Sequence, residues 1–452
     1  MREKLSRWTQ ASSNWLLAAL LFALPSGRHW VLLQARADQA HDAYYEPVLY
    51  VTDLLLLAVL CTWLAARLLD HERNKLRWGP AFLYLPLLGL LALGLISLPR
   101  AIDPIYALFP LARLALMLVF YFLLVNAPLQ RGLIVWPLVA SMVIQATVSV
   151  PQFLLGHTAG LEQLGEMPND SRWPGASVVA MGERRWLRAA GLTQHPNILG
   201  GLAMAALLIG SGYCLRRSGL RRLVLLGVLS VTVGTLLITF SRAAWLGTTV
   251  GSPVLLGLLI WAQRIGTQPI RRSSLWLLVG VVLAVVLVFV SLVWPLLMGR
   301  LGLASEGIEI RSVEERALLS QAGLDLIELR PWLGVGLGSF SSALYHLTPE
   351  AVATYASFAP VHNVLILATA ELGLGGGLLW LCLTASPWLA LWLRRRRVEM
   401  TPWWAGLCGA IAAFTVASFF DHYIWTFQQG RLMLWLVWGL WAREWTSSLA
   451  SH

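Results

Sequence analysis

The chain has 452 residues, of which 57% are hydrophobic and only 13% are charged. Soluble domains carry about a quarter charged residues, so this composition excludes a soluble globular protein. The net charge of +11 at first suggests a nucleic-acid partner. The basic residues gather between apolar segments, however, as they do in the cytoplasmic loops of membrane proteins, and we expect no nucleic acid to bind.

The apolar segments predict an all-α polytopic membrane protein. About twelve of them are each long enough to cross a hydrocarbon core of about 30 Å as a helix. In chain order, we expect spans at 14–33, 48–69, 80–98, 104–126, 132–155, 196–214, 221–240, 242–262, 274–297, 362–391, 402–420 and 430–446. Pro25-Ser26-Gly27 interrupts the first segment, but no clear cleavage site follows, so we interpret it as an uncleaved span.

Loop charge predicts how the chain crosses the membrane. With a cytoplasmic N-terminus, the inside segments hold most of the basic residues, which satisfies the positive-inside rule. Their clusters are Arg67/Arg73/Lys75/Arg77, Arg216/Arg217/Arg221/Arg222, Arg264/Arg271/Arg272 and Arg394–Arg397. An even number of spans then places both termini in the cytoplasm. The outer face receives the segments 156–195 and 298–361 and two short turns, Ser241-Arg242 and Asp421–Arg431.

The outer segment 298–361 is polar, yet its pattern predicts ordered structure. Apolar residues recur at helical spacing and predict an amphipathic helix that ends before Pro331. These residues are Val313, Ala317, Leu318, Leu324 and Ile327. After three closely spaced glycines, we expect short helices around 339–346 and after Pro349, which would lie against the membrane surface. The chain thus divides into membrane helices over 1–297, an outer loop domain over 298–361, and the last helices over 362–452.

His362 lies where the chain re-enters the membrane, directly after Pro360-Val361. An imidazole with an ordinary pKa near 6.5 can accept a proton at neutral pH, so His362 is a candidate general base. The alternative is an interfacial histidine that caps the start of a helix or contacts a lipid headgroup.

Arginines on the predicted outer face run against the positive-inside bias, which makes them informative. Arg242 lies in a two-residue turn between apolar helices, where a charge is costly unless it has a partner. Arg188 directly precedes the sixth span, and Arg184 and Arg185 lie nearby. Guanidinium groups bind phosphate through paired hydrogen bonds, so these arginines are candidate phosphate ligands. For Arg242 the alternative is a side chain that snorkels to lipid phosphate.

The remaining polar residues near these segments carry weaker patterns. His195 and Asn197 flank the first residue of the sixth span and are also explained as helix caps. Arg316 follows two glutamates, so a solvated ion-paired surface is as good an explanation as a site. Asp421 and His422 begin the last outer turn, where we expect a solvated turn by default.

Other features of the sequence bear on metals and buried charge. Arg113 lies inside the fourth span, and we expect it to pair with a carboxylate or to face a cavity. No Asp-x-Asp sequence occurs, so the usual metal handle for a sugar diphosphate is missing. The four cysteines have neither metal-ligand nor disulfide spacing. We expect no metal and no cofactor.

Four motifs together resemble the bacterial O-antigen ligase and O-antigen polymerase superfamily. They are Arg188-x-x-Gly191 with His195-Pro196-Asn197-x-x-Gly200, Thr239-x-Ser241-Arg242, Arg316 with Pro331-x-x-Gly334-x-Gly336-x-Gly338-x-Phe340, and His362-Asn363 with Glu371-x-Gly373. They cover about 188–377, in the order of the family around one large outer loop. The first five spans fit the family in topology only.

The resemblance implies a metal-independent glycosyltransferase of the kind called GT-C, with its active site at the periplasmic face of the bacterial inner membrane. Such enzymes move a glycan from an undecaprenyl diphosphate carrier to a sugar hydroxyl of a second lipid-linked molecule, with inversion. The acceptor is lipid A–core for a ligase of lipopolysaccharide biosynthesis and a second repeat unit for a polymerase. The implied partners are therefore this donor, this acceptor and membrane lipid.

The resemblance also implies roles for the candidate residues. His362 would be the general base, and Arg188 and Arg242 would stabilise the leaving diphosphate, with help from Arg316. Secondary candidates for the site are His195, Asn197, Asn363 and Asp421.

Other interpretations remain open at this point. A transporter of lipid-linked glycans would need polar residues at the midplane and paired repeats with broken helices. The sequence offers one deep arginine, Arg113, and no paired repeat. A non-catalytic scaffold is a third class, and loss of activity on changing His362 would argue against it. Ligase and polymerase are not separated, because the choice of acceptor depends on the shape of the cavity.

Overall fold

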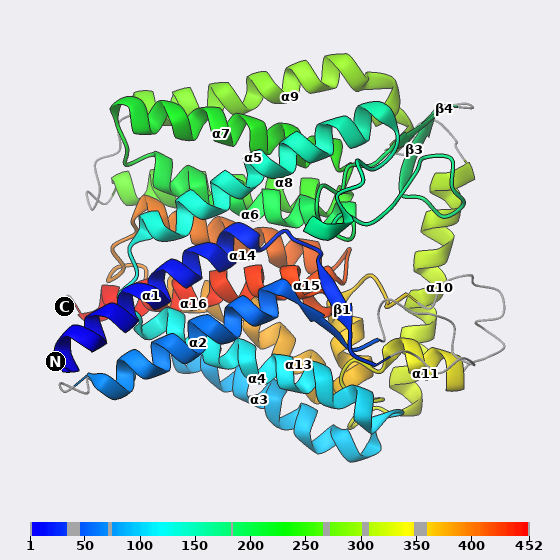
Figure 1. The fold of residues 1–452 in the computed structure, drawn as a ribbon, viewed down its shortest axis with the longest axis horizontal. Coiled ribbons are helices and arrows are strands. Elements are labelled where there is room, and N and C mark those ends of the chain that lie inside the picture. The colour runs from blue at the N-terminus through cyan, green and yellow to red at the C-terminus, as the bar shows by residue number, and fades with distance from the viewer. Residues whose placement is uncertain are drawn as a thin grey trace.

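The protein is a bundle of long helices that run roughly side by side (Figure 1). The computed structural model describes residues 2–33, 46–70, 75–181, 184–264, 272–300, 307–347 and 359–450. Helix α1 (Arg2–Ala23) begins and helix α16 (Gln428–Ala450) ends at the same end of the bundle. The short strands and the longer connecting segments gather at the opposite end, which we call the loop end (Figure 1).

The other long helices of the bundle correspond closely to the expected spans. They are α2 (Val51–Leu69), α3 (Ala81–Ser97), α4 (Pro104–Asn126), α5 (Arg131–Leu155), α6 (Pro196–Cys214), α7 (Gly219–Ile238), α8 (Arg242–Arg264), α9 (Arg272–Arg300), α13 (Val364–Leu393) and α14 (Pro402–Ser418). Among the described residues, nine helices are long and apolar enough to cross a membrane, which confirms an all-α polytopic membrane protein. Helices α1, α14 and α16 lie at three further expected spans but are not among these nine, so the total of about twelve stays a prediction.

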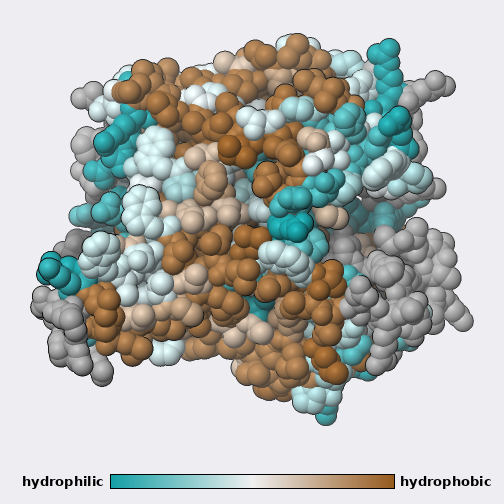
Figure 2. Space-filling view, in the orientation of Figure 1, coloured by the Kyte–Doolittle hydropathy of each residue, from teal (hydrophilic) through white to brown (hydrophobic). Residues whose placement is uncertain are grey.

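The surface of the bundle carries many exposed apolar side chains. Figure 2 shows hydrophobic residues across the middle of the visible face and more hydrophilic ones toward its two ends. Trp276, Leu287 and Leu292 of α9, for example, are 67–75% exposed. A soluble protein rarely exposes so large an apolar area, whereas a lipid-facing helix requires it.

Helix α6 forms the centre of the bundle, and all of its residues are buried. It packs closely on α14, since a Cβ atom added at Gly212 would lie 2.4 Å from the carbonyl oxygen of Pro402. Small residues let membrane helices approach in this way. Because the first residues of α6 reach the loop end, the central helix fixes the position of the polar groups there.

The loop end contains the short elements of the described chain and one long outer helix. They are β1 (His29–Val31), β2 (Val48–Tyr50), β3 (Val178–Met181), β4 (Arg184–Leu187), the 3₁₀ turns η1 (Leu98–Arg100) and η2 (Glu162–Leu164), and the helices α10 (Gly307–Leu329), α11 (Phe340–Leu347) and α15 (Tyr423–Thr426). Strand β1 pairs with β2, and β3 with β4, both antiparallel. Helix α10 stands across the ends of the bundle helices (Figure 1).

The structure corrects the first expected span and confirms most of the outer helices. The first helix ends at Ala23 rather than near residue 33, because the chain leaves the helix before Pro25 and then forms β1. Helix α10 ends at Leu329, before Pro331, and α11 covers the short helix expected around 339–346. The helix expected after Pro349 lies outside the described residues. The division at 297 and 361 stays a prediction.

A glycine-rich loop joins the outer segment to a broken membrane helix. Helix α13 has a non-helical residue at Gly373, with φ +74°. The loop after α10 fills the gap: the amides of Val335 and Gly336 donate to the carbonyls of Ala370 and Glu371 at 2.9 and 3.0 Å. A Cβ atom at Gly334 would lie 2.4 Å from the Glu371 backbone, so only glycine fits there. We call this contact of 334–336 with 370–373 the glycine joint.

Candidate active site

Four titratable side chains from three distant segments meet at the loop end. They are His195, His362, Asp421 and His422, and we call them the histidine–aspartate cluster. His195 precedes α6, His362 precedes α13, and the other two precede α15. The rings of His362 and His422 lie 4.9 Å apart between centroids and nearly perpendicular to each other.

A chain of hydrogen bonds joins this cluster to Arg188. The Nε of Arg188 donates to the carbonyl of Thr239 at 2.9 Å, and its Nη2 donates to Oδ1 of Asn197. The Nδ2 of Asn197 in turn donates to the carboxylate of Asp421. Arg188, Asn197 and Asp421 are 7%, 5% and 3% exposed, so these bonds form away from bulk water, where electrostatic interactions are strong.

The sequence predicts a solvated turn at Asp421 and His422. This prediction is wrong, since each residue is only 3% exposed. The turn packs inward because the Asp421 carboxylate closes it. Its Oδ1 accepts the backbone N–H groups of His422 and Tyr423 at 2.8 and 3.4 Å. A carboxylate used in this way can be buried without leaving its charge unsolvated.

The three histidines of the cluster differ in the use of their ring nitrogens. In His195, Nδ1 accepts from the amide of Asn197 at 3.1 Å, and Nε2 contacts the Ser177 hydroxyl at 3.3 Å. In His422, Nδ1 bonds the hydroxyl of Thr426 at 2.8 Å. The Nδ1 of half-buried His362, by contrast, is buried without a hydrogen-bond partner among the described residues. His362 therefore has a buried ring nitrogen whose hydrogen-bonding capacity the described residues do not use.

The environment keeps these histidines neutral. Burial and the charge of Arg188 lower the pKa of His195 to about 3. Burial and the neighbouring His362 lower the pKa of His422 to about 3. Burial also lowers the pKa of His362, although the negative charge of Asp421 raises it in part. A neutral imidazole is the form that accepts a proton.

Asp421 supplies the negative charge of the cluster. Burial raises the pKa of its carboxyl group, but its neighbours, among them the permanently charged Arg316, more than offset this effect, and the pKa lies below its ordinary value. Asp421 is therefore ionised at neutral pH. It can stabilise a positive charge that appears on His362 during a reaction.

Arg316 reaches the same cluster from α10. Its positive charge lowers the pKa of His195, His362 and His422 and also that of Asp421. Helix α10 packs against α13, whose first turn follows His362. Arg316, the predicted site residue of the outer segment, therefore lies near the predicted base His362, although the two are far apart in the sequence.

The turn between α7 and α8 holds Arg242 in a constrained position. Phe240 has φ +48°, a left-handed conformation that costs a non-glycine residue about 1–3 kcal/mol. Its ring is fully buried and stacks on Phe153 at 5.9 Å, and its carbonyl accepts from Nε of Arg300 at 3.1 Å. Arg242 is the first residue of α8, directly after this turn, and is half-buried.

This turn packs on the start of α6, where two of the sequence motifs meet. A Cβ atom at Gly200 would lie 2.9 Å from Cβ of Ser241, so a side chain there would push the turn away. Arg188 also holds the turn through the carbonyl of Thr239. The structure thus brings Arg188, Asn197 and the turn that carries Arg242 together.

Other predicted residues have clear structural roles. The Oδ1 of Asn363 accepts the amides of Leu365 and Ile366, so Asn363 caps α13 beside His362. His195 caps α6 in the same manner, as the alternative explanation required. Arg184 and Arg185 lie on β4, and Arg185 donates to the carbonyl of Trp173 at 3.3 Å.

Two polar residues of the loop end are not recognisable as site residues from the sequence. His422 lies in a polar turn, and no signal in the local sequence distinguishes it from a surface histidine. Arg300 ends α9 and is 5% exposed. Its position just past an apolar span is typical of an interfacial arginine, and only the fold shows that it holds the Phe240 carbonyl.

Comparison with known proteins agrees with the resemblance seen in the sequence. Residues 226–381 match the family model described as O-antigen ligase. This match confirms the expected superfamily and covers the turn of Arg242, the outer segment with Arg316, and the start of α13 with His362. No curated protein matches the sequence.

Proposed function

We propose, from the place of this chain in the O-antigen ligase superfamily, that it moves a glycan from a polyprenyl diphosphate carrier to a sugar hydroxyl of a lipid-linked acceptor, as an O-antigen ligase. The reaction takes place at the loop end, which faces the periplasm. It proceeds by direct displacement with inversion and without a metal. Polymerisation of the glycan, with a second carrier-linked unit as the acceptor, is the alternative within the same superfamily.

His362 is the general base of the proposed reaction. The acceptor hydroxyl donates its proton to the imidazole while its oxygen attacks the anomeric carbon of the donor glycan. The bond from that carbon to the diphosphate breaks, and the electron pair leaves with the carrier. The buried Nδ1 of His362, which has no hydrogen-bond partner in the part of the chain that the structure describes, is the observation that carries this assignment.

Asp421 stabilises the imidazolium that His362 becomes. The two groups interact electrostatically in a buried site. The attraction between opposite charges is stronger there than in water. Because Asn197 and the turn amides fix the carboxylate, no reorganisation is needed when the positive charge appears.

Arginines stabilise the charge that develops on the departing diphosphate. Arg242 and Arg316 contact it, since the half-buried Arg242 begins a helix at the loop end and Arg316 carries its charge to the cluster. Arg188 adds a third positive charge, but its described hydrogen bonds go to Thr239 and Asn197. It therefore braces the site as well.

Transfer by the purified protein in lipid nanodiscs tests this function. Mixed with polyprenyl diphosphate-linked glycan and lipid A–core, the wild-type protein should form the glycosylated acceptor without an ion gradient, and His362→Ala should not. His157→Ala is the matched control, because this histidine is exposed at the same end of the bundle.

The outcomes separate the alternatives. Near wild-type transfer by folded His362→Ala would remove the base assignment. Longer glycans formed from the donor alone would identify a polymerase. Absence of any product, together with flipping of the donor across the bilayer, would identify a transporter.

A further inference from the structure

A cavity lies next to the histidine–aspartate cluster. It has a volume of about 100 Å³, several times the space of about 10–15 Å³ that one water needs. Thr426 and Pro360 line it. The hydroxyl of Thr426 also bonds Nδ1 of His422 at 2.8 Å, and Pro360 precedes Val361-His362 in the chain. The cavity and the cluster therefore share a wall.

Aromatic rings from several elements line this cavity, and we call the space the aromatic cavity. They include Phe109 of α4, Trp380 of α13, Trp425 of α15, and Trp435 and Trp438 of α16. Trp380 holds the group together: its ring meets Trp425 at 5.7 Å and Trp438 at 5.9 Å between centroids. Rings fixed edge to face in this way offer rigid apolar surfaces to a ligand.

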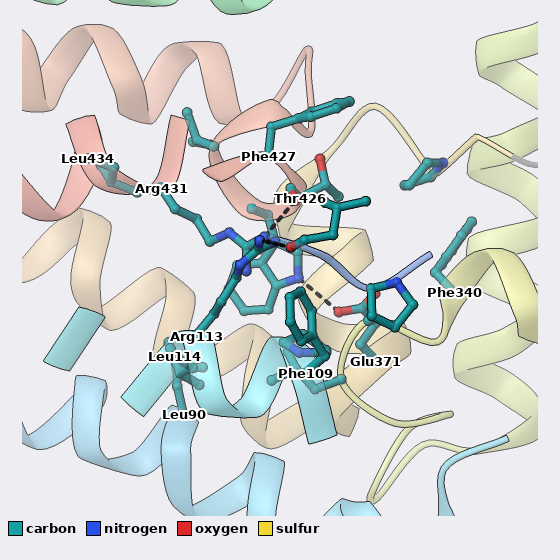
Figure 3. Close-up of a pocket in the computed structure, with 18 of the residues that line it drawn as sticks. Leu90, Phe109, Arg113, Leu114, Phe340, Glu371, Thr426, Phe427, Arg431 and Leu434 are labelled. Atoms are coloured by element: carbon teal, nitrogen blue, oxygen red, sulfur yellow. Dashed lines mark hydrogen bonds between the residues drawn. The ribbon is translucent and has the colours of Figure 1, made fainter. Parts of the chain in front are cut away.

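Charged side chains from membrane helices point into the same space. Figure 3 shows the guanidinium groups of Arg113 and Arg431 directed toward one another, with Glu371 on the facing side. Arg113 pairs with Asp53 at 2.7 Å, which supplies the carboxylate partner expected from the sequence. Ionisable residues inside membrane helices are costly, and they typically mark the path of a polar substrate.

Several buried donors on residues that line the cavity have no protein acceptor among the described residues. They are Nε1 of Trp380 and the Nε atoms of Arg113 and Arg431. Trp380 is 2% exposed and Arg113 is 6% exposed, so bulk water does not readily satisfy them. Glu371 provides an acceptor, since its carboxylate is held in place by Nε1 of Trp425 at 2.8 Å. Fixed donors and a fixed acceptor thus surround an aromatic space.

The balance of charge in the cavity does not favour a phosphate. Arg113 and Arg431 line it, but so do Glu46 and Glu371, and Asp53 neutralises Arg113 from behind. A phosphate bound there would face carboxylates as well as guanidinium groups. A neutral ring with many hydroxyls uses both kinds of group, because each hydroxyl is a donor and an acceptor.

We infer that the aromatic cavity binds a sugar ring of the glycan acceptor, with its hydroxyls on Arg113, Arg431 and Glu371 and its apolar face on the tryptophans. The identification of this sugar as the acceptor rests on the proposed function. It places the acceptor on one side of the 424–427 segment and the diphosphate arginines on the other. The anomeric carbon of the donor then lies between the acceptor hydroxyl and the leaving diphosphate, and the proposed base lies beside that hydroxyl.

Saturation-transfer difference NMR on the full-length protein in nanodiscs measures this binding directly. The probes are the methyl glycosides of glucose, galactose and mannose, with glucose 6-phosphate and inorganic phosphate as anionic comparisons. At least one glycoside should receive saturation from the wild-type protein. Arg431→Met should weaken its binding about tenfold, the effect of one lost hydrogen bond to a charged group.

Matched variants separate a cavity effect from a general one. Arg443→Met changes an arginine at the opposite end of the same helix, and Trp392→Leu changes a 61%-exposed tryptophan on the helix of Trp380. Both control variants should bind the glycosides as the wild type does, whereas Trp380→Leu should bind them more weakly. If Trp380→Leu fails to fold, Trp380→Phe keeps the ring, loses the unpartnered donor, and should bind more weakly than Trp392→Leu.

The results distinguish this inference from the proposed function. No glycoside signal in the wild type, or an unchanged signal in both cavity variants, would overturn the inference. Tighter binding of glucose 6-phosphate than of the methyl glucoside through Arg431 would make the cavity a phosphate site and would also overturn the inference.

His362→Ala should bind the glycosides normally, so a protein that binds sugar but transfers no glycan contradicts the proposed function alone. With transfer established, Arg431→Met should raise the KM for the acceptor about tenfold and leave the KM for the donor unchanged.

Discussion

The side-chain amide of Asn197 donates to the carboxylate of Asp421, across 224 positions of the chain. Asn197 is itself held by Arg188, and Asp421 acts on His362 through its charge. The start of the central helix α6 is therefore connected to the environment of the proposed base. Changes at either end of this connection should alter the reaction without altering the membrane bundle.

Asp421→Asn should lower kcat by about tenfold to a hundredfold, or ~1.4–2.8 kcal/mol of activation free energy. The amide keeps the size of the carboxylate but no longer stabilises a positive charge on His362. Transfer rates with saturating donor and acceptor measure the effect. Asp170→Asn is the control, since Asp170 pairs with the exposed Arg172 at the same end of the bundle. An unchanged kcat in Asp421→Asn would show that the carboxylate only closes its turn.

The rate of transfer should fall at acidic pH, with a midpoint below the ordinary histidine pKa of about 6.5. Burial lowers the pKa of His362, so the neutral base persists below that value and is lost only when the pH falls through the lowered pKa. Asp421 raises the pKa of His362. Replacement of Asp421 by Asn should therefore move the midpoint of this acidic fall in rate to still lower pH. The dependence of kcat/KM on pH reports the free enzyme and measures both midpoints. An acidic midpoint that does not move in Asp421→Asn would argue against electrostatic coupling between His362 and Asp421.

Arg242→Lys should reduce transfer by about tenfold or more, because an ammonium group cannot make the paired hydrogen bonds of a guanidinium to phosphate. Arg242→Ala should be weaker still. Arg264→Lys makes the same substitution at the exposed far end of the same helix and should leave transfer intact. Normal activity in Arg242→Ala would exclude Arg242 as an essential diphosphate contact.

Gly373→Ala should destabilise the protein by roughly 1–3 kcal/mol or more, since its φ of +74° is strained for any residue with a Cβ atom. The new Cβ would also lie 2.1 Å from the carbonyl oxygen of Trp332. Thermal unfolding in nanodiscs measures the loss. In Gly280→Ala the Cβ meets nothing within 4 Å, and the Tm should not fall. Equal Tm values for the two variants would contradict the glycine joint.

The sequence predicted the membrane helices well because their signal is local. Apolar length alone located α4 and α6 to the residue, at 104–126 and 196–214. The first helix was misplaced, because the segment after Pro25 is as apolar as a span yet pairs as a strand with 48–50. That pairing depends on a distant partner, which no local pattern contains.

The candidate site was predictable in its members but not in their contacts. His362, Arg188 and Arg316 were identified from their motifs and their predicted side of the membrane. The burial of Asp421 and His422 was missed, because a polar turn between two helices looks the same whether it faces water or packs inward. The partner of Arg113 was equally hidden, since Asp53 lies on another helix and is distinguished only by contact.

The glycine joint has a consequence for how the protein is made. The ribosome delivers residues 334–336 before 370–373, so the earlier amides have no carbonyls to bind until α13 has entered the bilayer. Helix α13 likewise cannot satisfy its broken backbone before that loop arrives. The outer segment and this span therefore mature together, and a nascent chain becomes competent for chemistry only after α13 is in place.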